Sequence, residues 1–172
     1  MHEMGSYRPV TVINIINKIF YGILKERVGE YVEERVLLSE EQNGFRKGRR
    51  GTDNIFILDE IIEKKAKQGK CVFIVCLDVE KAYDKNSRGD AEAVMEKLGV
   101  SRKIRNMIMN MYEGAETEIV WKNIAVKGIR RRKGLRQGCN LSPLIFAMCM
   151  EELVRRIKSK GQGVKIGQYS IG

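Results

Sequence analysis

Residues 71–84 constrain the fold more than any other stretch, because an apolar run ends there in an acid. Residues 71–77 are rich in β-branched types and too short for a buried helix, so they predict a central strand covered on both faces. Asp78 ends this strand, and Tyr83 comes five residues later. A strand holds a carboxylate rigidly, which suits a metal ligand, but an acid at this place can equally cap the next turn or helix. The stretch alone leaves both interpretations of Asp78 open.

Helical periodicity precedes the predicted strand. The first helix is expected at about residues 10–36, with Gly29 as a point where it could break, and the second at about residues 52–67. The first is predicted to present an apolar face made of Ile13, Ile16, Phe20, Ile23, Leu24 and Val28. The second is predicted to face inward with Ile55, Leu58, Ile61 and Ile62. A glycine-punctuated basic loop, residues 39–51, joins them.

Short helices and a hairpin follow the predicted strand. After an irregular turn at residues 84–89, Asp90 is expected to cap a helix that ends near residue 98, and Ser101 a helix that ends near residue 111. Residues 116–121 and 124–129 read as a β-hairpin, and residues 130–140 as a second basic, glycine-rich loop.

The last predicted helix spans about residues 142–158, with Ser142 as cap and Pro143 at the first helical position. It is expected to bury Leu144, Ile145, Met148 and Leu153. Residues 161–172 resemble a weak strand or hairpin tip. This order of elements predicts an α+β fold, with helices packed on a mostly antiparallel sheet.

The charge of the chain favours nucleic acid as a partner. Lys and Arg total 32 against 22 Asp and Glu, a net charge of +10. The excess gathers at residues 46–50, 127–136 and 155–160. Basic blocks interleaved with glycine suit phosphate backbones, although any single block can be only a solvated face.

Cysteine and hydropathy patterns narrow the class of protein further. The four cysteines form no C-x-x-C pair and have no histidine nearby, which argues against zinc and for a reducing setting. No apolar run is long enough to span a bilayer, and no signal peptide opens the chain. We expect an intracellular protein, in the cytoplasm, the nucleus or both, with no membrane partner.

Four separated motifs resemble, in the right order, the reverse transcriptases of non-LTR (LINE-like) retrotransposons. The first is Tyr7-Arg8-Pro9 with Asn14 and residues 18–20; the second is residues 42–49 with residues 52–54. The third is residues 77–84, Leu-Asp-Val-Glu-Lys-Ala-Tyr-Asp, and the fourth is residues 134–143, Gly-Leu-Arg-Gln-Gly-Cys-Asn-Leu-Ser-Pro. Together they cover nearly the whole chain.

The resemblance implies a right-hand polymerase that copies an RNA template onto a DNA primer from deoxynucleoside triphosphates. Residues 1–70 would form fingers, and residues 71–172 palm with interleaved fingers segments. The family's next block is an aromatic-x-Asp-Asp hairpin, and no Asp follows Asp90 in this sequence. The sequence therefore reads as a truncated domain without that catalytic hairpin, the thumb or the endonuclease.

The resemblance also implies roles for particular residues. Asp78 would be the catalytic carboxylate that binds two Mg²⁺ ions, which in this chemistry lie roughly 3.5 to 4 Å apart. Tyr83 matches the aromatic that lies under the sugar and discriminates against a 2′-hydroxyl; without the motif it would read as a core tyrosine. Arg8 matches a contact to the triphosphate, and Gln137 and Gly138 match residues that pack on the nucleotide and template base.

Other charged residues are assigned to the template or to local structure. Arg46, Lys47 and Arg49 would bind template phosphates, with solvated charge as the alternative for each. Glu80 and Asp84 read as local salt-bridge or turn-capping groups.

One carboxylate cannot hold two Mg²⁺ ions, so catalysis by this chain alone is not expected. Three hypotheses remain: a portion of an RNA-directed DNA polymerase, a binding module for RNA or RNA–DNA duplex without chemistry, and a relic without selected activity. The residues 85–90, which differ from the family's usual run, fit a decaying element copy or a tolerant surface turn.

Overall fold

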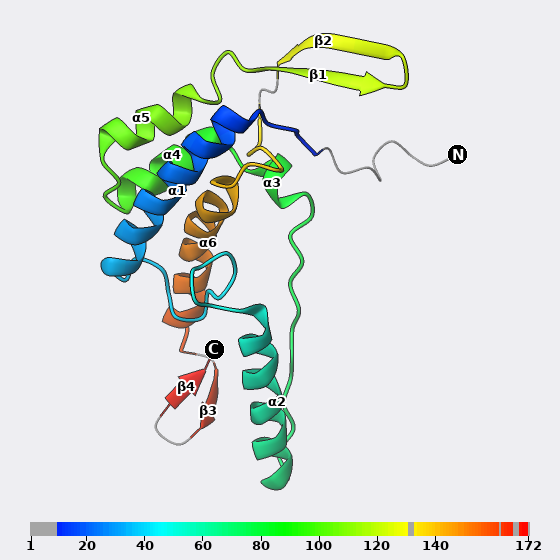
Figure 1. Cartoon of the computed structure of the whole chain (residues 1–172). Helices are drawn as coiled ribbons and strands as arrows, with labels where there is room; N and C mark the ends of the chain where they lie inside the picture. Colours follow the sequence, from blue (N-terminus) through cyan, green and yellow to red (C-terminus); the bar gives the residue numbers. More distant parts are fainter. Residues whose placement is uncertain (1–9, 131–132, 162, 167–168, 172) are drawn as a thin grey trace.

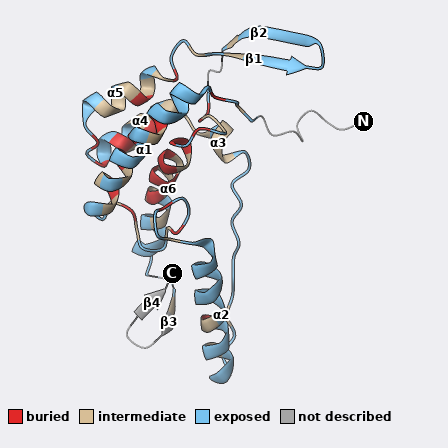
Figure 2. Cartoon of the chain, in the orientation of Figure 1, coloured by how far each residue is buried: buried red, intermediate tan, exposed pale blue. Residues whose placement is uncertain are grey.

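Four helices form the body of the protein. The structure is a computed structural model, which describes residues 10–130, 133–161, 163–166 and 169–171 (Figure 1). The helices are α1 (Ile15–Glu34), α4 (Arg88–Lys97), α5 (Arg102–Asn110) and α6 (Ser142–Ser159). The hydrophobic core lies between them, and its fully buried side chains include Val32, Met95, Ile108 and Ile145 (Figure 2).

Helix α1 buries only part of the face that the periodicity predicts: Leu24 and Val28 are buried in the helix, and Ile13 is buried just before it. It begins after Asn14, whose side chain accepts a hydrogen bond from the Asn17 amide, and it passes through Gly29 without a break. The buried residues are Tyr21, Leu24, Val28 and Val32, at spacings of three or four. Ile16, Phe20 and Ile23 are exposed, so their assignment to the core is wrong. The apolar residues of α1 are compatible with two faces, and the buried one joins the core formed with residues of α4, α5 and α6.

Helix α2 (Gly51–Lys67) and residues 70–79 project from the body as an arm (Figure 1). Of the four α2 residues predicted to face inward, Ile61 is buried, whereas Ile55, Leu58 and Ile62 are exposed. The bounds of this helix were predicted within one residue, but its burial was not.

Residues 71–77 are extended, yet they do not form the predicted buried strand. Phe73 is 93% exposed and Val75 is 80% exposed. A central strand needs neighbouring strands to bond its backbone groups and cover its faces. Among the described residues, no strand pairs with this segment. The β-branched composition of residues 71–77 favours an extended backbone, whereas the burial of these residues would require a neighbouring strand.

The chain turns after the arm through α3 (Ala82–Lys85) into α4. Ser87, and not Asp90, caps α4, because its hydroxyl accepts a hydrogen bond from the Asp90 amide. Asp90 instead occupies the first turn of α4, where its negative charge interacts favourably with the positive end of the helix dipole. Ser101 caps α5 as predicted.

All strand pairing in the described part of the chain is antiparallel. Strands β1 (Glu116–Trp121) and β2 (Ile124–Arg130) form the predicted hairpin, which extends from the helical body (Figure 1). Strands β3 (Val164–Ile166) and β4 (Tyr169–Ile171) form a second pair. The predicted α+β character is confirmed at this level, but these are two separate two-stranded sheets and not one sheet packed on helices.

Helix α6 starts one residue earlier than its predicted cap implies. Ser142 is the first helical residue and is buried, with its hydroxyl 3.3 Å from the Tyr112 hydroxyl, so it does not cap the helix. Leu144, Ile145 and Met148 are buried as predicted, whereas Leu153 is exposed. None of the helices in the described ranges has the length and hydropathy needed to cross a membrane.

Candidate functional site

The glycine-rich loop at residues 134–139 docks on α3. The Leu135 amide donates a hydrogen bond to the Tyr83 carbonyl (2.8 Å), and the Gly134 amide donates one to the Asn86 carbonyl (3.1 Å). Gly134 has a φ of +85°, and a Cβ at this position would lie 2.9 Å from the Tyr83 carbonyl oxygen. Glycine therefore permits the close approach that brings two distant motifs together.

The segment before α1 reaches the same loop. The Thr11 amide donates a hydrogen bond to the Gln137 carbonyl at 3.0 Å. Gly138 has a φ of +94°, and a Cβ there would lie 2.6 Å from the Thr11 carbonyl oxygen. Arg8 lies outside the described residues, three positions before Thr11 in the sequence. The structure thus places Gln137 and Gly138 against Thr11, which lies between Pro9 and Asn14 of the first motif.

Gln137 also contacts α3 through its side chain. Its amide nitrogen donates a hydrogen bond to a carboxylate oxygen of Asp84 at 3.3 Å. Asp84 was expected to act locally, and this partner is 53 residues away in sequence, so no local pattern signals it. Glu80 does act locally as predicted, pairing with Lys85 at 2.6 Å.

Tyr83 lies at the edge of the core. Its ring packs on Phe146 of α6, with ring centroids 5.5 Å apart. Burial raises the pKa of the Tyr83 hydroxyl above its ordinary value. The side chain is only half-buried, so part of it is available for contact with a ligand.

Asp78 is exposed and lies four residues before α3. Its carboxylate is a hard oxygen ligand, which suits Mg²⁺. Within the part of the chain that the structure describes, no three His, Cys, Asp or Glu side chains gather to hold a metal ion. The donor chemistry at Asp78 therefore fits one ligand of a magnesium site.

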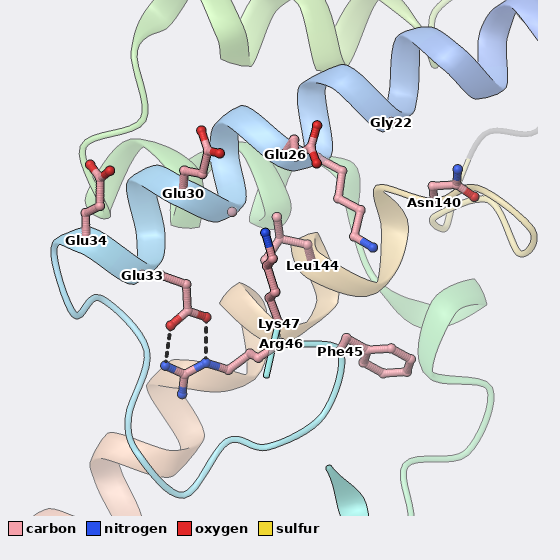
Figure 3. A pocket seen from close by; sticks show the side chains of 12 residues that line it. Gly22, Glu26, Glu30, Glu33, Glu34, Phe45, Arg46, Lys47, Asn140 and Leu144 are labelled. Atoms are coloured by element: carbon pink, nitrogen blue, oxygen red, sulfur yellow. Dashed lines mark hydrogen bonds and ion pairs between the residues drawn. The ribbon is translucent and has the colours of Figure 1, made fainter. Parts of the chain in front are cut away.

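Arg46 is buried and fully engaged with its own chain. Its guanidinium donates two hydrogen bonds to the Glu33 carboxylate of α1, at 2.8 and 2.7 Å (Figure 3). A third nitrogen donates to the carbonyls of Ser39 and Gln42. The hydrogen bonds from Arg46 lower the pKa of Glu33. Arg46 therefore anchors the basic loop in this structure.

Lys47, in contrast to Arg46, is exposed. It lines a pocket of about 760 Å³ between α1, the basic loop and the start of α6 (Figure 3). The pocket lining also includes Phe45, which is exposed, and Asn140, two residues after Gly138. Arg49 forms an ion pair with Glu40 within the same basic loop. Of the three predicted template-binding residues, Lys47 has the side chain least committed to the fold.

Glu151 on α6 is a second anchor of the basic loop, and the sequence analysis missed it. Its buried carboxylate accepts hydrogen bonds from the Ser39 amide (2.9 Å), the Ser39 hydroxyl (2.6 Å) and the Gln42 side chain (2.6 Å). Arg155, one turn later, donates a further bond. Burial by itself raises the pKa of Glu151, but these hydrogen bonds outweigh it and leave the pKa below its usual value.

The sequence of the chain was compared with known protein families and known proteins. A family model described as "Reverse transcriptase (RNA-dependent DNA polymerase)" matches residues 2–170. The "Retrovirus-related Pol polyprotein from type-1 retrotransposable element R2" of Nasonia vitripennis is 28% identical over 99% of this chain and 16% of its own length. A protein of the same description from Popillia japonica is 29% identical over 99% of this chain and 24% of its own length. The type-2 element R2DM protein of Drosophila melanogaster is 26% identical over 94% of this chain and 15% of its own length.

Proposed function

The chain belongs to the reverse transcriptase family, and from this premise we propose that it is the nucleotide- and template-binding part of an RNA-directed DNA polymerase. In this proposal residues 1–70 belong to the fingers, and residues 71–172 to the palm with interleaved fingers segments. The chain spans less than a quarter of the length of the relatives described above, so the whole polymerase activity is part of the proposal.

One observation carries the proposal. Tyr83 comes from one motif and Gln137 and Gly138 from another, and backbone hydrogen bonds join these two motifs to each other and to Thr11, which lies within the span of the first motif. A binding loop whose backbone is fixed in this way loses little conformational entropy when a ligand binds. The convergence supports a nucleotide site at the loop of residues 134–139.

The residues would divide the work of nucleotide addition. Two bound Mg²⁺ ions would activate the primer 3′-hydroxyl and stabilise the leaving pyrophosphate. Asp78 would supply one of the carboxylates that hold them. Arg8 would contact the triphosphate, because a planar guanidinium matches phosphate oxygens. Tyr83 would lie under the sugar and exclude a 2′-hydroxyl, and Gln137 with Gly138 would pack on the base pair.

The RNA template would lie on the basic loop. Lys47 and Arg49 would bind its phosphates, and Arg46 would act through its position, since Glu33 engages its guanidinium. The salt bridge between Arg46 and Glu33, and the hydrogen bonds that Glu151 accepts from Ser39 and Gln42, keep this loop in place for such contacts. We infer an intracellular site of action, where an RNA template and deoxynucleoside triphosphates are present.

Primer extension on an RNA template tests the proposal. In the protein at its natural length, Asp78→Asn should lower the rate of DNA synthesis by about a thousandfold or more, because the amide is a poor Mg²⁺ ligand, while leaving template binding unchanged. Asp59→Asn, at an exposed site on α2, is the matched control and should retain activity. Full activity of Asp78→Asn would contradict the proposed role.

A non-catalytic RNA-binding module is the second candidate. It is favoured by the anchored basic loop and by the exposure of Asp78, which joins no cluster of three His, Cys, Asp or Glu side chains in the part of the chain that the structure describes. We expect the chain alone to bind template and to need further carboxylates for synthesis, since one acid cannot hold two ions. RNA binding that falls steeply with salt, with no synthesis even at natural length, would favour this module over the polymerase.

A further inference from the structure

Arg136 lies next to Gln137 in the loop, but its side chain turns towards the helical body. One guanidinium nitrogen donates a hydrogen bond to the Tyr21 hydroxyl of α1 at 2.7 Å. Another donates to the Met111 carbonyl, just after α5, at 2.7 Å. Arg136, which precedes Gln137 and Gly138, is therefore held by two segments outside the loop.

The same guanidinium lies over the ring of Tyr112, with its central carbon 5.4 Å from the ring centroid. Tyr112 is 4% exposed, so this cation–π contact is shielded from water and gains in strength. The Tyr112 hydroxyl lies 3.3 Å from the Ser142 hydroxyl at the start of α6. Tyr112 thus connects Arg136 to a third helix.

Arg88, at the start of α4, holds the other end of the loop on the same tyrosine. Its guanidinium carbon lies 5.1 Å from the Tyr112 ring centroid. It donates hydrogen bonds to the Tyr112 carbonyl at 3.3 Å and to the Gly134 carbonyl at 3.5 Å. Both Gly134 and Arg136 are therefore tied to Tyr112, on either side of Leu135.

We propose that Arg136 is a positioning residue for the incoming nucleotide: anchored on Tyr21, Met111 and Tyr112, it fixes Gln137 and Gly138 against Thr11. The identity of the ligand rests on the function proposed above. A loop with glycine at positions 134 and 138 has many backbone conformations available, and each must be given up when a ligand is bound. The anchor removes most of these conformations beforehand, so its loss should weaken nucleotide binding more than it slows the chemical step.

Amide hydrogen exchange in this chain tests the anchor itself. Arg136→Lys keeps the charge but cannot donate in the forked geometry, so the Gly134 and Leu135 amides should exchange about tenfold faster. Tyr21→Phe removes one acceptor and keeps the buried ring, and it should act in the same direction with a smaller effect. Arg156→Lys, at an exposed site on α6, is the matched control and should leave the loop unchanged. Unchanged exchange in both Arg136→Lys and Tyr21→Phe would overturn the anchor.

Steady-state kinetics of the natural-length protein test its consequence. Arg136→Lys should raise the KM for deoxynucleoside triphosphate by about tenfold while kcat stays within about twofold. A fall in kcat with unchanged KM would instead indicate a purely structural role and overturn the proposal. If the unmodified protein incorporates no nucleotide, the proposed function is wrong, and a nucleotide is not the ligand of this loop. The exchange measurement would still decide whether Arg136 anchors the loop.

Discussion

Two acidic residues on different helices, Glu33 and Glu151, hold the basic loop. Glu33 of α1 does so through Arg46, and Glu151 of α6 through Ser39 and Gln42. Hydrogen bonds to a charged group are stronger than neutral ones, and they require that the carboxylate stay ionised. The loop therefore depends on two buried or half-buried carboxylates that a one-dimensional motif search does not single out.

Glu151→Gln should lower the free energy of unfolding by about 2 kcal/mol at pH 7, because the amide cannot accept the same charge-assisted hydrogen bonds. Urea unfolding monitored by circular dichroism measures this change. Glu34→Gln, at an exposed site on α1, is the control and should have little effect. Equal stability of Glu151→Gln and the unmodified protein would show that the network contributes nothing to the fold.

The same carboxylate predicts an acid-dependent loss of stability. The folded-state pKa of Glu151 lies below its unfolded value, so its contribution is complete above the unfolded pKa, about 4.3 for glutamate, and is lost as the pH falls through the folded pKa. In Glu151→Gln this part of the pH dependence should disappear. An unfolding curve with the same acid slope in both proteins would contradict this assignment.

The contacts between the helices, strands and loops were harder to predict from the sequence than the elements themselves. Gly138 is the sharpest example, since a Cβ there would lie 2.6 Å from the Thr11 carbonyl oxygen and the φ of +94° is unfavourable for other residues. The contact joins the segment before α1 to the loop of residues 134–139. It is the step that completes the candidate site.

Gly138→Ala should separate Thr11 from Gln137 and destabilise the protein by about 1 to 3 kcal/mol, because alanine is strained at this φ and its methyl group meets the carbonyl. Thermal unfolding and exchange of the Thr11 amide measure the two effects. Gly44→Ala is the control, since nothing lies within 4 Å of a Cβ at that position. A stable Gly138→Ala protein with a protected Thr11 amide would contradict the proposed close approach.

The sequence predicted the elements well where their signals are local. The β1–β2 hairpin and the Ser101 cap follow from turn and capping chemistry within a few residues. The cap of α4 was missed because Ser87 and Asp90 are both good capping residues, and the intervening turn decides between them. The buried face of α1 was predicted only in part, with Leu24 and Val28 right and Tyr21 and Val32 missed, because the helix carries apolar residues on more than one face.

At the scale of the whole molecule, the candidate site is assembled from segments that no local pattern joins. The motifs predicted Tyr83, Gln137 and Gly138 individually, and the structure brings them together through Thr11, Asp84 and Asn86. No sequence pattern signals the contacts of Arg136 with Tyr21 or of Glu151 with Ser39, because the partners are 115 and 112 residues apart in sequence. The exposed arm shows the opposite case, since residues 71–77 carry a strong strand signal without a described neighbour to bury them.

We propose that Tyr83 and the loop of residues 134–139 form the nucleotide site of a reverse transcriptase domain. The most direct measurement is the ratio of deoxynucleotide to ribonucleotide incorporation on an RNA template by the natural-length protein. Tyr83→Val, which removes the ring that would meet a 2′-hydroxyl, should lower this ratio by about 10- to 100-fold. Tyr31→Val, which changes a tyrosine that bonds to the Leu98 and Gly99 carbonyls away from the loop, is the control. A ratio that Tyr83→Val leaves unchanged would contradict the claim, because the sugar would then not lie on Tyr83.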